Sequence, residues 1–298
     1  MTISWLYFAE CIEAVDSAKI SIVTPWYNQG QFIERTVRSV FGQQYANLEY
    51  ILMDGGSTDA MLSVLEPYRD KFAYFRSGAD KGQADAIASG FEVSTGEIMA
   101  YLNSDDILAP GTLHFINEFF REHPKVDFIY SDRVLIDEDD TVLGYWILPR
   151  HFDFLMRRWD LIPQETCFWR RPLLEKAGNI DPSLHFTIDY DLFVRFMKFS
   201  RFLCVNRILA AFRVHSLSKT SNQMTTVGKA EVDAAWRKYR IRHGAGDAVI
   251  EEWLTQLVGK YGELHARSNR CLSGAFPGIG YDYDSVWGGF LKSQPKCQ

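Results

Sequence analysis

Hydrophobic and polar positions alternate in blocks along the first half of the chain, and the blocks predict strands and helices in turn. Short apolar runs bounded by turn-forming residues are typical of buried strands, and they occur at residues 19–24, 48–53, 72–76, 98–102 and 128–131. Apolar positions at helical spacing lie between them and predict helices at residues 31–43, 61–68, 84–91 and from 110 onward. This alternation with short connections predicts an α/β fold with a doubly wound, mostly parallel sheet and right-handed crossovers.

The second half of the chain is less regular, and its pattern predicts shorter elements. They are a helical turn at 153–159, a strand at 164–171 that enters a helix at Pro172, a helix from 188, strands at 202–205 and 208–214, and helices within 225–242 and 247–265. The glycine- and aromatic-rich residues from 273 receive no assignment. We therefore expect an N-terminal leader (1–18), one α/β domain (19–222) and a C-terminal helical and aromatic appendage (223–298).

Composition and charge narrow the class of protein. A chain of 298 residues with 47% hydrophobic and 23% charged residues is long enough for one large domain with an appendage. The net charge of −6, without a block of lysine or arginine, argues against a nucleic-acid binder. Five scattered cysteines without CxxC spacing suggest a reducing compartment and no zinc site.

Membrane and targeting signals are weak. No apolar run approaches the roughly 20 residues that a membrane-spanning helix needs. The apolar N-terminus lacks a basic leader and soon meets Glu10, Glu13 and Asp16, which is untypical of a signal peptide. We expect a cytoplasmic protein without a transmembrane segment. Peripheral contact with a membrane and the oligomeric state stay open.

Three polar loops follow predicted strands, at residues 25–28, 54–57 and 103–106. In a parallel sheet the carboxyl ends of the strands share one edge, and ligands bind outside that edge. We therefore expect these loops to meet in one site.

Two adjacent carboxylates, Asp105 and Asp106, end the apolar run 98–102. Like charges side by side repel each other unless a cation or solvent neutralises them. A hard divalent ion with oxygen ligands would do so and leave positions for phosphate oxygens. The alternative is a solvated loop that caps the next helix.

The chain resembles the family 2 glycosyltransferases over roughly residues 19–220. The resemblance rests on motifs in the order and spacing of that family, at residues 21–28, 54–59, 80–87, 103–106, 164–171, 189–192 and 212–215 with 218–220. It implies a GT-A fold and an inverting enzyme that uses a nucleotide-sugar donor. Nothing comparable covers the leader or the appendage.

The resemblance implies a nucleotide site in the first half of the chain. Asp54 would accept a hydrogen bond from the base, commonly from uracil N3–H, and Tyr27 would stack on the base. A turn or capping aspartate and a core tyrosine are the alternatives. The expected nucleotide-binding residues are Pro25, Tyr27, Asn28, Asp54, Gly56, Ser57, Lys81, Gln83, Asp85, Ser104 and Asp105.

The resemblance also implies a divalent cofactor, Mn²⁺ or Mg²⁺, which suits oxygen ligands. Asp106 would bind the metal directly, and Asp105 would contact the ribose or reach the metal through water. His215 matches a family histidine that reaches the metal or the diphosphate. Taken alone, such a histidine is more often a buried or surface residue.

Asp189 aligns with the general base of the family, which removes the proton of the acceptor hydroxyl. Ile188 replaces a glutamate that the family usually has there, so Asp191 is kept as a second candidate for the base. Residues i and i+2 point to different helix faces, and one of the two would cap the helix or pair with Arg195. Gln164 and Trp169 are expected on the acceptor side, although a tryptophan there could equally belong to the core.

These observations predict a metal-dependent inverting glycosyltransferase, a hexosyl or related transferase. It would move sugar from a nucleoside diphosphate, most plausibly UDP, to a hydroxyl of a glycan or lipid-linked acceptor. One alternative is a catalytically silent sugar- or nucleotide-binding relative, which is favoured by Ile188 in place of the usual family glutamate. Another is a sugar nucleotidyltransferase, which would need a glycine-rich, basic phosphate loop where residues 25–28 stand.

Overall fold

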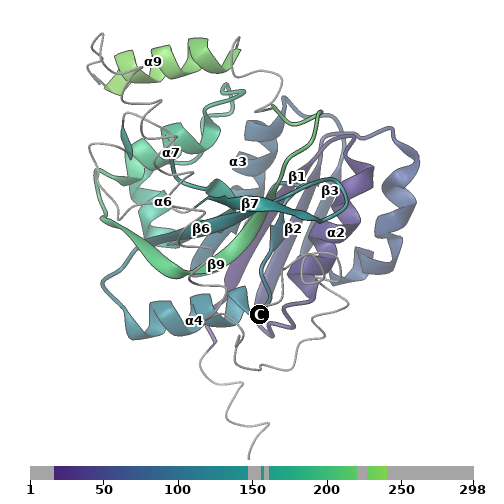
Figure 1. The fold of residues 1–298 in the computed structure, drawn as a ribbon, viewed down its shortest axis with the longest axis horizontal. Helices are drawn as coiled ribbons and strands as arrows, with labels where there is room; N and C mark the ends of the chain where they lie inside the picture. Colours follow the sequence, from purple (N-terminus) through teal and green to yellow (C-terminus); the bar gives the residue numbers. More distant parts are fainter. Residues whose placement is uncertain (1–16, 147–155, 158–160, 220–226, 240–298) are drawn as a thin grey trace, which may run out of the picture.

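A computed structural model of the chain describes residues 17–146, 156–157, 161–219 and 227–239. Its centre is one mixed sheet in the order β3-β2-β1-β4-β8-β6-β9-β5, with β7 paired to β6 (Figure 1). The strands are β1 (Ile20–Trp26), β2 (Leu48–Asp54), β3 (Tyr74–Ser77), β4 (Ile98–Tyr101), β5 (Ile107–Leu108), β6 (Phe128–Ile136), β7 (Val142–Trp146), β8 (Phe168–Arg170) and β9 (Phe202–Arg213). The helices are α2 (Gly30–Phe41), η1 (Ala60–Lys71), α3 (Gln83–Val93), α4 (Thr112–Glu122), η2 (Gln164–Thr166), α6 (Arg171–Ala177), α7 (Ile188–Phe196) and α9 (Lys229–Tyr239).

The first half of the chain forms the predicted parallel sheet. β1 pairs in parallel with β2 and β4, and β2 pairs in parallel with β3. Every residue of β1 is buried because helices cover both faces of the sheet. One face packs on α3, α6 and α7, and the other packs on α2, α4 and η1. Gly90 of α3 permits the close approach, since a Cβ there would lie 2.4 Å from Cγ1 of Val23.

Antiparallel strands extend the sheet in the second half. β8 runs antiparallel to both β4 and β6, while β9 runs parallel to β6 and antiparallel to β5. The expected strands 202–205 and 208–214 are one continuous strand, β9, whose pairing with β6 shifts register between Ser131 and Arg133. The hairpin strand β7 and the short β5 were not predicted.

Two predicted elements take another form. The expected helix at 61–68 lies in a 3₁₀ helix, η1, which contains Pro67. Proline lacks an N–H, and in an α-helix its ring also clashes with the carbonyl of the residue four positions earlier, which disfavours an α-helix here. The expected strand at 164–171 is a 3₁₀ turn, η2, followed by the short strand β8 and the start of α6.

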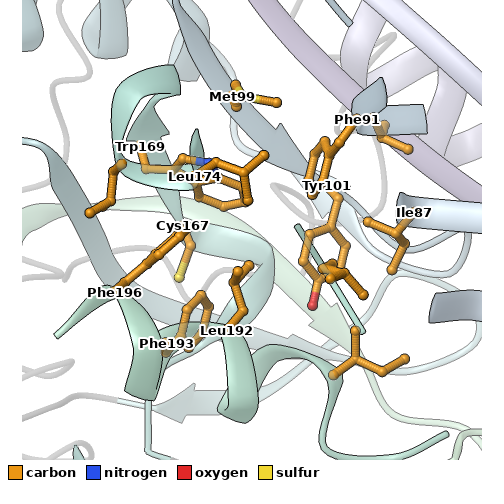
Figure 2. Packing of buried hydrophobic residues seen from close by; sticks show 14 of the residues in the cluster. Ile87, Phe91, Met99, Tyr101, Cys167, Trp169, Leu174, Leu192, Phe193 and Phe196 are labelled. Carbon is orange, nitrogen blue, oxygen red and sulfur yellow. The ribbon is translucent and has the colours of Figure 1, made fainter. Parts of the chain in front are cut away.

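The core between the sheet and the helices α3 and α7 is rich in aromatic side chains. Trp169 of β8 lies between α3 and α7, with ring centroids 5.7 Å from Phe91 and 5.5 Å from Phe196 (Figure 2). Phe193, on the same helix as Phe196, packs edge-to-face on Phe128 of β6. These contacts fix α7 against the sheet.

The C-terminal appendage is described only in part. α9 lies beside α7 (Figure 1), where its Lys238 and Tyr239 hydrogen-bond to Asp191. The predictions for 1–16, for most of 153–159 and for the residues beyond 239 lie outside the described residues. Among the described residues, no helix has the length and apolar character to cross a bilayer.

Candidate active site

The loops that leave the carboxyl ends of β1, β2 and β4 meet at one edge of the sheet. The Gln29 amide donates a 3.2 Å hydrogen bond to Oδ2 of Asp105, and the Ser104 hydroxyl donates to the Gln29 side-chain oxygen. At the start of α3, the Gln83 side-chain amide donates a 2.8 Å hydrogen bond to Oδ1 of Asn103, in the loop after β4. The expected convergence of these polar loops is therefore present.

Asp54 ends β2 with its carboxylate fully buried. Oδ1 accepts hydrogen bonds from the Ser57 backbone N–H at 2.9 Å and the Ser57 hydroxyl at 2.6 Å, and Oδ2 accepts one from the Ser77 hydroxyl at 2.5 Å. Gly56, which lies between Asp54 and Ser57 in the chain, has a φ of +86°, a left-handed conformation that favours glycine. Asp54 thus shapes the loop after β2, and a nucleotide base could reach it only if one of these donors moved.

The loop after β1 presents one exposed aromatic ring. Tyr27 is 62% exposed, which leaves its face open to a flat ligand, whereas Pro25 is buried within β1. Asn28 has a φ of +49° and accepts hydrogen bonds from the backbone N–H groups of Thr58, at 2.9 Å, and Asp59, at 3.3 Å. Asn28 therefore ties this loop to the loop after β2.

The segment before α3 contributes a polar bridge rather than an obvious phosphate loop. Lys81 is exposed, and its backbone N–H donates a 3.3 Å hydrogen bond to Asp85. The Gln83 side-chain oxygen accepts a 2.7 Å hydrogen bond from the Lys219 ammonium. Lys219 also interacts electrostatically with Asp105. Sequence reasoning assigned no role to Lys219, although it lies in the matched segment 218–220.

Asp105 and Asp106 occupy different surroundings. Asp105 Oδ2 hydrogen-bonds to His215 Nε2 at 3.0 Å, and Asp106 Oδ1 accepts a 3.0 Å hydrogen bond from the backbone N–H of Arg213. Burial, followed by the charges of Asp105 and Glu165, raises the pKa of Asp106 well above its ordinary value. A cation beside this pair would reverse the effect and favour both ionised carboxylates.

The Arg213 side chain is fully buried and holds the loop that carries the two aspartates. Its Nε donates a 2.8 Å hydrogen bond to the backbone oxygen of Asp105, and its Nη1 donates a 2.7 Å hydrogen bond to that of Asp137. Nη2 pairs with Asp140 at 2.5 Å. Arg213 thereby links the Asp105–Asp106 loop to the β6–β7 turn. The sequence signal was an arginine within the apolar run 208–214.

Asp189 belongs to the same electrostatic cluster through Glu165 and Arg133. Burial dominates in raising the pKa of Asp189 to about 6, with Glu165 raising it further and Arg133 opposing it. Glu165 is buried, lies 3.4 Å from Nη1 of Arg133, and interacts electrostatically with Asp105. Sequence reasoning missed both Glu165 and Arg133. Glu165 adjoins the candidate Gln164, whereas Arg133 comes from a strand without a motif.

Asp191 does not share this cluster. Its carboxylate is buried and accepts hydrogen bonds from Nε of Arg195 at 2.9 Å, Lys238 at 2.7 Å and the Tyr239 hydroxyl at 2.6 Å. Together with the neighbouring positive charges, these bonds lower the pKa of Asp191, although burial alone would raise it. The structure thus corrects the expectation that Asp191 could stand in for the base, because its oxygens are engaged elsewhere.

The two acceptor-side candidates also separate. Gln164 donates a 2.8 Å hydrogen bond to the backbone oxygen of Tyr101 and accepts one from Asn103, so it borders the site. Trp169 is fully buried among core aromatic rings (Figure 2). The expectation that Trp169 walls an acceptor pocket is wrong, because its strand directs it into the core.

The donor atoms at this edge suit a hard cation only in part. Among the described residues, no group of three or more His, Cys, Asp or Glu side chains is arranged to hold a metal ion. Asp105 and Asp106 supply adjacent carboxylates, and the pKa of Asp106 is raised chiefly by burial and then by the charges of Asp105 and Glu165. These residues fit a metal whose remaining ligands come from a diphosphate and water.

Known proteins resemble this chain over the part that forms the sheet and the site. The family model described as "Glycosyl transferase family 2" matches residues 21–195, more than half of the chain. An uncharacterised glycosyltransferase of Rickettsia typhi is 28% identical over 229 residues, which cover 74% of this chain and 71% of the relative. Chondroitin synthase of Escherichia coli is 26% identical over 223 residues, which cover 68% of this chain and 32% of that longer protein.

Solved structures show the same fold. S. aureus TarS 1-349 in complex with UDP-GlcNAc has a TM-score of 0.60 at 16% identity, covering 93% of this chain and 82% of that one. The mannosyltransferase PcManGT from Pyrobaculum calidifontis, in complex with GDP-Man and Mn²⁺, has a TM-score of 0.58 at 15% identity, covering 93% and 81%. The sheet is thus of the GT-A type. The chain belongs to glycosyl transferase family 2 and is a glycosyltransferase.

Proposed function

We propose that the protein is a metal-dependent, inverting glycosyltransferase with Asp189 as its general base. It would transfer a sugar from a nucleoside-diphosphate sugar, in the first place a UDP-sugar, to a hydroxyl of a glycan or lipid-linked acceptor. The observation that carries this proposal is the ion pair of the buried Glu165 with Arg133, 3.4 Å apart, which interacts electrostatically with both Asp106 and Asp189. These residues come from segments far apart in the sequence.

The reaction follows from the roles of these side chains. The acceptor hydroxyl transfers its proton to Asp189 as its oxygen forms a bond to the anomeric carbon. The bond from that carbon to the phosphate oxygen breaks, and the nucleoside diphosphate leaves with the electron pair. Because attack and departure occur on opposite sides of the carbon, the configuration inverts. Asp189 is half-buried, and burial raises its pKa to about 6. This suits the task, since a base works best with a pKa near the working pH.

The donor would lie along the loops after β1, β2 and β4. Tyr27 offers an exposed ring on which a base can stack, and Ser104 and Asp105 border the expected position of the ribose and diphosphate. Lys219, which meets Gln83 at this edge, would offset phosphate charge. UDP is the first choice because the carboxylate of Asp54 can accept from an imide N–H, once a donor such as Ser77 yields. Related folds bind UDP-GlcNAc and GDP-Man, so both donors are test ligands.

Asp106, with Asp105 and His215 nearby, would hold a Mn²⁺ or Mg²⁺ ion together with the diphosphate. When bound, such an ion neutralises charge on the leaving diphosphate. The Arg213 backbone N–H binds the carboxylate of Asp106, and the Arg213 side chain binds the backbone oxygen of Asp105, so Arg213 holds this loop at the site edge. We expect Asp106→Ala to reduce Mn²⁺-dependent UDP binding by about tenfold or more.

Calorimetric titration of UDP with and without Mn²⁺ measures this effect. Glu92→Gln, an exposed carboxylate on α3, serves as the matched control and should bind UDP as the parent does. Unchanged metal-dependent affinity in Asp106→Ala would remove Asp106 from the proposed metal site.

A catalytically silent, nucleotide-binding relative is the second candidate, which Ile188 favours because it stands where a glutamate is expected. Release of UDP from UDP-GlcNAc, or of GDP from GDP-Man, in the presence of Mn²⁺ separates the two. The proposed enzyme shows slow, Mn²⁺-dependent release of nucleotide even without acceptor. Tight binding of both donors without any release would favour the silent protein.

A further inference from the structure

The helix α9 contacts the segment that carries Asp189 through several side chains. Glu231 of α9 accepts hydrogen bonds from three consecutive backbone N–H groups just before α7. The distances are 2.9 Å from His185, 2.8 Å from Phe186 and 3.0 Å from Thr187. The Thr187 hydroxyl donates a fourth bond at 3.2 Å. A single carboxylate thus fixes the backbone of the three residues directly before α7.

These N–H groups need such a partner. They precede Ile188, the first residue of α7, so the hydrogen bonds within the helix do not satisfy them. A backbone N–H that is buried away from water, such as that of the buried Thr187, is costly without an acceptor. Glu231 supplies this acceptor from another helix. Although burial alone would raise it, these bonds lower the pKa of Glu231, so the carboxylate is ionised at neutral pH.

The other side of Asp189 is held from the same helix. Asp191 accepts hydrogen bonds from Lys238 and Tyr239, and the Trp236 indole N–H donates a 3.1 Å bond to the Tyr190 hydroxyl. Ala235 of α9 is buried against Tyr190. The residues on both sides of Asp189 are therefore fixed by one element.

The approach of the two segments is close as well as polar. A Cβ at Gly228, directly before α9, would lie 2.9 Å from the ring of Phe186. Only glycine fits there without moving that ring. The loop before α7 is thus packed between its own helix and the start of α9.

We propose that α9 is a positioning element for the catalytic base, acting mainly through Glu231. The proposal rests on the proposed role of Asp189. Glu231 fixes the backbone of 185–187, and this sets where α7 begins and hence where Asp189 stands relative to Glu165 and Arg133. The part of the appendage that lies against α7 would therefore belong to the active site. A displacement of about 1 Å in a reacting group can cost about 10²-fold in rate.

The test compares Glu231→Ala and Glu231→Gln with Asp233→Asn on the same helix. Turnover of UDP-GlcNAc or GDP-Man with Mn²⁺, whichever the parent uses, is measured as kcat and KM across pH. We expect Glu231→Ala to lower kcat by about tenfold or more and to change the donor KM much less, because the loops after β1, β2 and β4 do not contact Glu231. Lys219, whose ammonium hydrogen-bonds to the backbone oxygen of His185 at 3.1 Å, is the one link from this segment to the proposed donor residues that we identify in the described part of the chain. Glu231→Gln retains an acceptor oxygen and should recover part of the rate. Asp233→Asn should match the parent.

Hydrogen exchange at residues 185–187 reports the positioning without reference to activity. Exchange should quicken in Glu231→Ala, while the core strand β1 stays protected. If Glu231→Ala unfolds, Tyr239→Phe is the milder variant, because it removes only the hydroxyl that meets Asp191. Faster exchange at 185–187 with unchanged kcat and pH profile would overturn the positioning role while leaving the proposed function intact. Parent-level turnover in Asp189→Asn would instead overturn the proposed function itself.

Discussion

At the scale of single residues, the surroundings of Asp189 set the pH range in which it would act as the proposed base. Burial is the chief cause that raises the pKa of its carboxyl. Of the charged neighbours, Glu165 raises this pKa further and Arg133 lowers it. The first turn of α7 supplies a backbone N–H from Tyr190 at 2.9 Å, which favours the ionised form. The balance leaves a pKa of about 6.

This balance predicts a pH dependence. A base acts only when ionised, so kcat/KM should fall about tenfold per pH unit below the pKa of about 6. Glu165→Gln removes a neighbouring negative charge, which makes ionisation of Asp189 easier and moves the acid limb to lower pH. Turnover of the nucleotide sugar between pH 4.5 and 8 measures this limb. An acid limb that stays in place, or moves to higher pH, would contradict the coupling.

Arg213 gives a second prediction at this scale. Its guanidinium reaches the backbone oxygens of Asp105 and Asp137 and the carboxylate of Asp140 at once. A lysine ammonium cannot match this planar fork, so Arg213→Lys should lower the free energy of unfolding by about 2 kcal/mol and weaken Mn²⁺-dependent UDP binding. Urea unfolding and calorimetry measure the two effects. Arg76→Lys, on the edge strand β3, is the control. Normal stability together with normal affinity would show that Arg213 does not organise the loop.

At the scale of elements, Glu49, near the amino end of β2, joins three segments at the edge of the sheet opposite the site. It accepts hydrogen bonds from the Ser21 hydroxyl at 2.5 Å, from the Thr95 backbone N–H at 2.6 Å and from the Thr95 hydroxyl at 2.6 Å. Lys19 forms a 2.8 Å ion pair with the same carboxylate. Burial would raise the pKa of Glu49, but these partners outweigh it and lower the pKa to about 2.

Stability should therefore depend on Glu49 with a definite sign. A carboxyl whose folded pKa is depressed from 4.5 to about 2 stabilises the fold above pH 4.5, and this contribution is lost as pH falls toward 2. Glu49→Gln should reduce the free energy of unfolding at pH 7 by about 2–3 kcal/mol and by much less near pH 2. Denaturant unfolding at both pH values tests this. The exposed Glu66→Gln is the control, and an equal loss at both pH values would contradict the assignment.

The elements also show what local pattern can predict. Helical spacing found α2, α3, α4 and α7, because their apolar stripes face a sheet that covers them. The parallel strands β1, β2 and β4 were found because burial on both faces leaves continuous apolar runs, whereas the edge strand β3 is only partly buried. β5 was missed because it has only two residues and depends on pairing with the distant strand β9. β7 was missed although it forms a hairpin with β6, and Pro67 altered η1 in a way that spacing does not reveal.

At the scale of the whole molecule, the site combines predicted loops with residues that only the folded chain assembles. Asp105, Asp106 and Asp189 were recognised from motifs, and the rule that ligands bind at the strand ends predicted that the polar loops would meet. Glu165 lies in the motif 164–171 but received no role, and Arg133 lies in no motif, because the effect of both arises from burial beside carboxylates from other segments. Trp169 failed as a site residue for the converse reason: a motif position does not show which way a strand faces.

We propose that Asp189 accepts the proton of the acceptor while donor binding depends on the loops at the strand ends. The most direct measurement compares Asp189→Asn with the parent in two assays, turnover of a nucleotide sugar with Mn²⁺ and calorimetric binding of UDP. Asparagine keeps the size of the side chain and cannot accept the proton, so turnover should fall by about 10²-fold or more while UDP affinity stays unchanged. Turnover at the parent rate in Asp189→Asn would contradict the claim.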